Sequence, residues 1–299
     1  MVRIRTNYKK PTTYILNISE SYRKSYNSLK KIGVKDPQLE AEVLIRHVLN
    51  ISRTQFYISL EKPLLSIQEK HIDSLIKERL NSKPLPYITN HKEFYNLDLI
   101  VNPSVLIPRP ETELLIDIAI DYSNNINKNN LLRVAELGTG SGAISIAIAK
   151  NIENSQIKAT DISKKSLEVA KINARKNSVD KQIIFFHKSI FKPINNLFEL
   201  IISNPPYIKT KTLKLLEKEV QKEPQIALDG GEDGLKFIKY IINNYFNQLS
   251  PNGSIIIEID PNQKDIIKNL TNTLNSCNVE FYKDINNLTR AVQIKKTTS

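Results

Sequence analysis

Apolar residues recur at helical spacing through the first third of the chain. Gly33 follows such a stretch, as is typical of a glycine that ends a helix, and Pro37 stands where it can open the next one. Ser66 and Glu69 fit a capping box ahead of another apolar helical face. The pattern predicts a small helical bundle over residues 1–88.

A change of pattern follows this bundle. Pro84 and Pro86 are expected to end the helical run, because proline lacks the N–H group that a helix interior needs. Polar and apolar residues then alternate over residues 93–107, as they do in a β-hairpin. We therefore expect residues 89–108 to form a hairpin linker between two domains.

From residue 109 to residue 299, short apolar runs alternate with helical segments. Strands are expected at residues 131–137, 156–162, 183–187, 197–203 and 254–259, and helices at 111–122, 142–150, 164–177, 235–248 and 263–275. This alternation predicts an α/β fold, a doubly wound and mostly parallel sheet with helices on both faces. The last two apolar runs, 279–285 and 290–296, are separated by too few residues for a parallel crossover, so they are expected to pair antiparallel.

Composition narrows the class of protein. The 299 residues, of which 40% are hydrophobic, suffice for one large domain and a small one. No stretch approaches the roughly 18 apolar residues of a membrane span, and the first residues lack the apolar core of a signal peptide, so we expect a cytoplasmic protein with no membrane partner. The single cysteine, Cys277, excludes an internal disulfide, and the four histidines lack metal-ligand spacing, so no bound metal is expected.

The net charge of +12 is open to two interpretations. A basic protein suits a partner rich in phosphate, such as a ribosome-associated protein or a nucleic acid. Lysine, asparagine and isoleucine are all abundant while glycine is scarce, which is also what a low-GC coding bias produces. The charge therefore does not identify a partner.

Six of the eight glycines lie in two loops, and the first of these loops, ELGTGSGA, follows a predicted strand and opens a predicted helix. Such a loop brings backbone N–H groups and the positive end of a helix dipole close to a nucleotide-like ligand. A tight strand-to-helix turn is the plain alternative. The candidate ligand-binding residues of the loop are Gly138, Thr139, Gly140, Ser141 and Gly142.

Two carboxylates end the predicted strands beside this loop. Asp161 follows the next strand, where it can accept hydrogen bonds from both ribose hydroxyls of a nucleoside, although it could instead cap the following helix. Glu136 could accept a hydrogen bond from the amino group of a methionine moiety. Both NAD and S-adenosylmethionine carry adenosine, so these residues do not choose between them.

The segment Asn204-Pro205-Pro206-Tyr207 follows the strand at 197–203, at the carboxyl edge of the predicted sheet. An amide or exocyclic amine is a poor nucleophile, so a methylating enzyme must orient it. The side-chain oxygen of Asn204 and the carbonyl of Pro205 can each accept one N–H of such a group, Pro206 has no competing N–H, and the ring of Tyr207 can pack on it. This segment favours a methyltransferase, and a proline-rich loop without function is the alternative.

With these motifs the chain closely resembles the release factor glutamine methyltransferases, the PrmC or HemK family, over nearly its whole length. The segments that carry the resemblance are IPRPETE (107–113), ELGTGSGAI (136–144), TDIS (160–163), SNPPYI (203–208), EPQIALDGGEDGL (223–235) and DINNLTR (284–290). The resemblance implies a helical N-terminal domain that helps hold the release factor, and a seven-stranded, Rossmann-like class I methyltransferase domain at 109–299 with an antiparallel last strand. It implies S-adenosylmethionine as cofactor and, as target, the glutamine of the Gly-Gly-Gln motif of class I peptide chain release factors.

Matched by position, the resemblance assigns the cofactor to Gly138 through Gly142 and Asp161, with Ile190 beside the adenine ring, and the target glutamine to Asn204 through Tyr207. Ser189 replaces the usual acidic residue before Ile190. The usual glycines are replaced by Asn90, Asp260 and Asn287, of which asparagine tolerates a positive φ better than most residues.

Three charged residues of the IPRPETE segment, Arg109, Glu111 and Glu113, are candidates to cover the site or order its entrance. Capping of the helix expected at 111 is the equal alternative. The loop DGGEDG is expected to form a turn near the substrate channel.

Other activities remain compatible with the same residues. Methylation of adenine N6 in RNA or DNA uses the same logic for an exocyclic amine, and a ribosomal protein glutamine is another possible acceptor. A non-catalytic binding module would not need Asn204 and the glycines, and hydride transfer with NAD would leave the Asn-Pro-Pro-Tyr segment unexplained. We expect a monomer that forms no stable nucleic-acid complex.

Overall fold

The structure is a computed structural model that describes residues 16–126 and 131–297. The chain divides into two compact units, Met1–Thr89 and Asn90–Ser299. The division falls beside residue 88, where the helical bundle was expected to end, and the hairpin belongs to the second unit.

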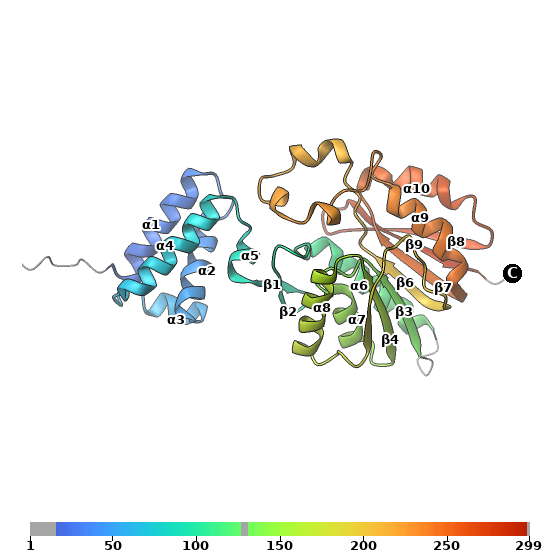
Figure 1. The fold of residues 1–299 in the computed structure, drawn as a ribbon, viewed down its shortest axis with the longest axis horizontal. Helices are drawn as coiled ribbons and strands as arrows, with labels where there is room; N and C mark the ends of the chain where they lie inside the picture. Colours follow the sequence, from blue (N-terminus) through green and yellow to red (C-terminus); the bar gives the residue numbers. More distant parts are fainter. Residues whose placement is uncertain (1–15, 127–130, 298–299) are drawn as a thin grey trace, which may run out of the picture. The chain divides into compact units, whose positions relative to one another are not determined.

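The described part of the first unit is helical (Figure 1). Its helices are α1 (Ile18–Lys31), α2 (Pro37–Leu49), α3 (Arg53–Ile58), α4 (Ser66–Leu80) and α5 (Leu85–Thr89). Their apolar faces meet in one core, in which Leu29, Leu44, Phe56 and Ile72 are fully buried. This amphipathic packing is the arrangement that the helical spacing predicts.

The predicted helix ends are partly correct. Gly33 follows α1 with a φ of +78°, a conformation that glycine adopts without steric cost, and Pro37 opens α2. The capping box at Ser66 and Glu69 is wrong. The helix begins one residue earlier than predicted, so Leu65 is the cap and its N–H donates to the side chain of Gln68 at 2.9 Å.

The predicted end of the helical run at the prolines is also wrong, because α5 forms over Leu85–Thr89. Pro86 lies in its first turn, where the missing N–H has no intrahelical partner to lose. Beyond it, β1 (His91–Phe94) and β2 (Leu97–Ile100) pair antiparallel. The hairpin is shorter than the alternation over 93–107 predicts, since Val105 and Ile107 are buried without being part of a strand.

The described residues of the second unit contain a seven-stranded sheet in the order β5-β4-β3-β6-β7-β9-β8. Its strands are β3 (Leu132–Leu137), β4 (Ser155–Asp161), β5 (Ile183–His187), β6 (Phe198–Ser203), β7 (Leu249–Glu258), β8 (Cys277–Lys283) and β9 (Thr289–Lys296). Strands β3 to β7 pair parallel, whereas β9 runs antiparallel to both β7 and β8. The predicted doubly wound sheet with an antiparallel last strand is confirmed.

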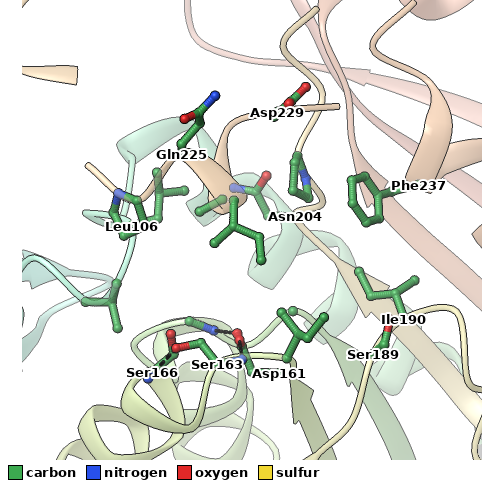
Figure 2. Close-up of a pocket in the computed structure, with 18 of the residues that line it drawn as sticks. Leu106, Asp161, Ser163, Ser166, Ser189, Ile190, Asn204, Gln225, Asp229 and Phe237 are labelled. Carbon is green, nitrogen blue, oxygen red and sulfur yellow. Dashed lines mark hydrogen bonds between the residues drawn. The ribbon is translucent and has the colours of Figure 1, made fainter. Parts of the chain in front are cut away.

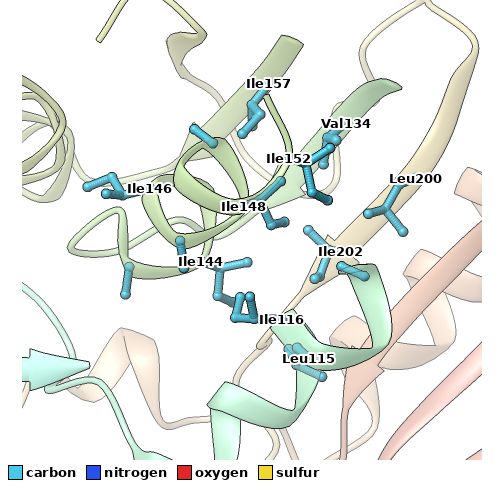
Figure 3. Close-up of a cluster of buried hydrophobic side chains, with 14 of the residues drawn as sticks. Leu115, Ile116, Val134, Ile144, Ile146, Ile148, Ile152, Ile157, Leu200 and Ile202 are labelled. Atoms are coloured by element: carbon cyan, nitrogen blue, oxygen red, sulfur yellow. The ribbon is translucent and has the colours of Figure 1, made fainter. Parts of the chain in front are cut away.

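Helices cover both faces of this sheet (Figure 1). On one face, α6 (Glu113–Asn125), α7 (Ala143–Asn151) and α8 (Lys164–Lys176) enclose a core that Figure 3 shows in part. On the other face lie α9 (Lys236–Tyr245) and α10 (Lys264–Thr271). Neighbouring residues of one strand serve opposite cores, as Val134 and Ala135 of β3 do, because successive strand side chains point to opposite faces.

Short 3₁₀ turns lie in several of the connections. They are η1 (Pro110–Thr112), η2 (Thr210–Leu215), η3 (Val220–Lys222), η4 (Gln225–Ala227), η5 (Phe246–Gln248) and η6 (Pro261–Gln263). The chain reverses its winding between β3 and β6, which are neighbours in the sheet. The loops at the carboxyl ends of these two strands therefore diverge, and this is where ligands bind in open α/β sheets.

Candidate active site

A cavity of about 510 Å³ opens at the carboxyl ends of β3, β4, β5 and β6 (Figure 2). The loops that follow these strands form its floor, and residues 104–106, 224–227 and the start of α9 form its walls. In Figure 2, Asp161 and Ser163 lie on one side of the cavity, and Asn204, Gln225 and Asp229 lie on the other. The cavity thus joins the glycine loop after β3 and the Asn-Pro-Pro-Tyr segment after β6.

The glycine loop after β3 contributes Gly138 and Gly140 to the lining. Their φ angles are +78° and +55°, which favour glycine, and a Cβ on Gly138 would lie 3.7 Å from Ile190 Cδ1, inside the cavity. Gly142 packs instead on helix α8, where a Cβ would come within 3.2 Å of Ala170 Cβ. Among the described residues, the lining includes neither Gly142 nor its neighbours Thr139 and Ser141.

Asp161 lies at the end of β4 with its carboxylate at the cavity. Its oxygens accept the N–H of Gly140 at 2.9 Å and the N–H of Ser163 at 2.8 Å, which fixes the side chain, and burial raises the pKa of this carboxyl. The cap of α8 is Ser163, whose hydroxyl accepts the N–H of Ser166. Ser163, and not Asp161, therefore caps α8.

Glu136 is 1% exposed and is not among the described residues that line the cavity. Its Oε2 accepts the hydroxyl of Thr139 at 2.6 Å and the N–H of Ser145 at 3.2 Å. Burial raises the pKa of Glu136 to about 7. These contacts brace the glycine loop from inside, and a direct contact with a methionine moiety stays a prediction.

The part of the lining after β5 and at the start of α9 brings together Ile190, Phe191 and Phe237, and Lys236 Nζ lies over both phenylalanine rings. The two phenylalanine rings stack at a centroid distance of 5.2 Å. Ser189, which stands where the family has an acidic residue, accepts the N–H of Phe191 on its hydroxyl at 3.2 Å. A flat aromatic ligand thus meets aliphatic and aromatic side chains rather than a carboxylate at this wall.

Asn204 lines the cavity directly after β6. Its Nδ2 donates to Thr112 Oγ1 at 3.0 Å, and the hydroxyl of Thr112 donates to Glu258 Oε2 at 2.5 Å. The hydroxyl of Tyr207 donates to the other oxygen of Glu258 at 3.1 Å. The lining includes Asn204 and Pro206, but Pro205 and Tyr207 are not among the described lining residues, so the predicted packing of the Tyr207 ring on a target group stays a prediction.

The second glycine loop supports this segment from behind. A Cβ on Gly230 would lie 2.7 Å from Tyr207 Cα, and one on Gly234 would lie 2.4 Å from the Tyr207 carbonyl oxygen. Only glycine permits so close an approach of two backbones. The DGGEDG loop therefore holds the Asn-Pro-Pro-Tyr backbone in place, and Asp229 at its start lines the cavity.

The IPRPETE segment forms a salt bridge and a hydrogen bond with Glu223, next to the cavity wall at residues 224–227. Arg109 forms a salt bridge with Glu223, whose other oxygen accepts the N–H of Ile107 at 3.0 Å. Glu223 is 5% exposed, so this pair closes one side of the cavity between Leu106 and Pro224. Glu113 accepts the N–H of Tyr95 at 2.8 Å and so fastens the β1–β2 turn, while Glu111 is half-buried.

The three replaced glycines differ from one another. Asn90 and Asn287 adopt φ angles of +60° and +63°, so asparagine takes the conformation that glycine would. Asp260 has a φ of −73° and accepts the N–H of Asn262 at 2.9 Å, as a helix cap does. None of the three lines the cavity within the described chain.

Sequence reasoning missed Thr112, Glu258 and Glu223. A usable signal existed for Glu258, because a polar residue at the carboxyl end of a central parallel strand faces the ligand edge of the sheet. Thr112 and Glu223 lie in segments that the sequence analysis noted for other residues. Their partners are distant along the chain, so no local spacing reveals them.

The fold and cavity are those of a Rossmann-like methyltransferase, and comparisons with known proteins agree. The PrmC N-terminal domain family matches residues 20–89, and the methyltransferase small domain family matches residues 122–233. The chain is 38% identical to the release factor glutamine methyltransferase of Thermodesulfovibrio yellowstonii, over 87% of this chain and 93% of that one. It belongs to the release factor glutamine methyltransferase family.

Two further comparisons set limits on this likeness. The chain is 35% identical to the bifunctional methyltransferase of Rickettsia typhi over 93% of its own length, but it spans only 57% of that protein. The hMettl16 catalytic domain in complex with MAT2A 3'UTR hairpin 6 matches 73% of this chain and 84% of that structure, with a TM-score of 0.56 and 16% identity. This last likeness is one of fold alone.

The cofactor of this class of enzyme is S-adenosylmethionine, and the residues present fit it. Asp161 offers a fixed carboxylate for ribose hydroxyls, Gly138 keeps the cavity open, and Ile190 faces the space beside them. None of the helices in residues 16–126 and 131–297 is long and apolar enough to cross a membrane. The same residues contain no cluster of three or more histidine, cysteine or acidic side chains suited to a metal ion.

Proposed function

We propose that this protein transfers a methyl group from S-adenosylmethionine to the side-chain amide nitrogen of a glutamine in a protein, the glutamine of the Gly-Gly-Gln motif of class I peptide chain release factors. The observation that carries the proposal is that Asn204 opens into the same cavity as Gly138, Gly140 and Asp161. An amide acceptor and a nucleoside site thus share one space of about 510 Å³.

The protein's contribution to the reaction is orientation. The bound cofactor supplies an activated sulfonium methyl group. The Asn204 side-chain oxygen and the Pro205 carbonyl accept the two N–H groups of the target amide, which directs the nitrogen lone pair at that methyl group. Pro206 offers no N–H to compete for these acceptors, and the methylated nitrogen loses one proton to water.

A protein glutamine is favoured over adenine as the acceptor. Both units of the chain match the release factor glutamine methyltransferase relatives, and the first unit matches the PrmC N-terminal domain. The likeness to an RNA-bound methyltransferase rests on fold, and the net charge of +12 has a compositional explanation as well. Release factors act on cytoplasmic ribosomes, so we place the enzyme in the cytoplasm. We also propose that the enzyme acts as a monomer and forms no stable nucleic-acid complex.

A labelling experiment tests the proposal. The purified protein is incubated with methyl-labelled S-adenosylmethionine and, separately, with a release factor, a variant of that factor with alanine in place of the Gly-Gly-Gln glutamine, a ribosomal protein mixture and total RNA. Mass spectrometry then locates the label. We expect label on that glutamine and none on the alanine variant. Label in RNA or in a ribosomal protein instead would reject the release factor as substrate.

A further inference from the structure

A buried chain of hydrogen bonds runs behind Asn204. Thr112 of η1 lies between Asn204 and Glu258, with distances of 3.0 Å to Asn204 Nδ2 and 2.5 Å to Glu258 Oε2. Thr112 is 4% exposed and Glu258, the last residue of β7, is 2% exposed. Neither residue belongs to the lining of the cavity among the described residues, so their effect on a ligand must be indirect.

The donors and acceptors available in this series of hydrogen bonds fix the direction of each bond. An ionised carboxylate can only accept, so Glu258 takes the hydroxyl protons of Thr112 and Tyr207 on its two oxygens. Thr112 has one hydroxyl proton, and it is used. Its oxygen can therefore only accept from Asn204, which must turn its NH2 group toward Thr112.

This constraint settles which end of the Asn204 amide is available to a ligand. An asparagine amide that is free to rotate presents either its oxygen or its NH2 group. With the NH2 group held by Thr112, the oxygen Oδ1 is the end left for the cavity that Asn204 lines. A target glutamine needs an acceptor there, because its own NH2 group must be held.

We propose that Thr112 and Glu258 are positioning residues that lock the Asn204 amide with its oxygen toward the methyl acceptor. Tyr207 completes the arrangement, since its hydroxyl satisfies the second oxygen of Glu258 and ties the Asn-Pro-Pro-Tyr segment to the end of β7. The buried carboxylate thereby selects the amide orientation that binds a nitrogen donor. This inference rests on the proposed function and deepens it.

Three variants test the inference in the full-length protein. Thr112→Val has nearly the same shape but no hydroxyl, so Asn204 is free to rotate, and we expect kcat for release factor methylation to fall about tenfold or more. KM for S-adenosylmethionine should not change. Thr112→Ser keeps the hydroxyl and should restore most of kcat. Thr271→Val is the matched control, because Thr271 is also buried but donates to the Lys268 carbonyl in α10.

A second measurement does not depend on the methyl acceptor. In protein labelled with ¹⁵N-asparagine, the signal of the Asn204 side chain is identified by its loss in Asn204→Asp. We expect its hydrogen-bonded amide proton to exchange slowly with water in the wild type, Thr112→Ser and Thr271→Val, and fast in Thr112→Val. This readout reports the orientation lock itself, whereas a general loss of stability would affect Thr271→Val as well.

The outcomes separate the inference from the proposed function. If the wild type methylates the release factor and Thr112→Val does so at the same kcat, the inference is overturned and the proposed function stands. If the wild type does not methylate it, the proposed function fails, and the amide signal alone decides. Unchanged exchange in Thr112→Val then rejects the lock, while fast exchange confirms it.

Discussion

Asn204 is the residue on which the proposed chemistry depends most directly. It lines the cavity and has one amide end held by Thr112. We predict that Asn204→Ala lowers kcat about a hundredfold, by analogy with the loss of one pre-organised polar group that stabilises a transition state. Cofactor affinity should stay near that of the wild type, because Asp161 and the glycine loop are unaffected. Initial rates and calorimetric titration with S-adenosylmethionine measure the two effects, and near-normal turnover would contradict the role.

Glu258 should make the reaction sensitive to pH. Burial raises its pKa to about 7, in surroundings that include the Tyr207 hydroxyl, Glu111 and Arg290. Above this pKa the carboxylate accepts both hydroxyl protons. Below it the neutral carboxyl can donate to Thr112, which frees the Thr112 proton for Asn204 Oδ1 and favours the wrong amide orientation. We predict that kcat at saturating cofactor falls as the pH drops through about 7.

Substitution of Glu258 tests the origin of this fall in kcat at low pH, the acidic limb of the pH profile. In Glu258→Gln the fall of kcat at low pH should disappear, since a glutamine side chain does not titrate. Glu136 is the matched control, because burial raises its pKa to about 7 as well but it contacts the glycine loop. Glu136→Gln should therefore keep the limb. An acidic limb that persists in Glu258→Gln and vanishes in Glu136→Gln would assign the pH dependence to the glycine loop.

At the scale of elements, Asn173 of α8 connects the β1–β2 hairpin to the glycine loop after β3. It is fully buried, accepts the N–H of Ile100 at 2.7 Å, and donates to the carbonyls of Ile100 and Ser141, both at 2.9 Å. Asn173→Ala removes the side-chain partner of three backbone groups, one buried and two half-buried, so we predict a loss on the order of 2–4 kcal/mol in the free energy of unfolding of the second unit. Cofactor affinity should fall too, because the loop at Ser141 loses its support.

Denaturant unfolding and cofactor titration check the Asn173 prediction. Asn151→Ala is a suitable control, since Asn151 also lies near a helix end in this unit, but within the described residues its side chain donates locally, to the Ala147 carbonyl at 2.8 Å. It should change stability little and cofactor affinity not at all. Equal effects of the two substitutions would show that the bridge to Ser141 does not matter.

The same scale explains what the sequence could predict. Buried parallel strands are continuous apolar runs, so β3 to β6 were found within a residue or two of their ends. The glycine loop and the Asn-Pro-Pro-Tyr segment are local motifs, and strand order alone brings them to one edge. The hydrogen bond from Thr112 to Glu258 and the salt bridge from Arg109 to Glu223 join residues 146 and 114 positions apart. No local pattern encodes such pairs, because they form only when the sheet has assembled.

On the scale of the whole molecule, we predict that the two units carry separable tasks. The cavity-lining residues all belong to Asn90–Ser299, and this unit has its own cores on both faces of its sheet. The first unit has a core of its own and matches the PrmC N-terminal domain. We therefore predict that a chain of residues 90–299 folds and binds S-adenosylmethionine with the affinity of the full-length protein, as calorimetry would measure.

The contribution of each unit should show in methylation rates, because an intact release factor can contact surface that a short peptide does not reach. A short peptide with a Gly-Gly-Gln sequence needs only the cavity, so residues 90–299 and the full-length protein should methylate it at similar kcat/KM. An intact release factor should lose about tenfold or more in kcat/KM with residues 90–299, since each 1.4 kcal/mol of lost partner binding corresponds to a factor of ten. Asn204→Ala in both chains serves as the inactive control. Equal rates on the intact factor would show that the first unit contributes nothing to its recognition, whereas loss of activity on the peptide as well would show that the cavity depends on the first unit.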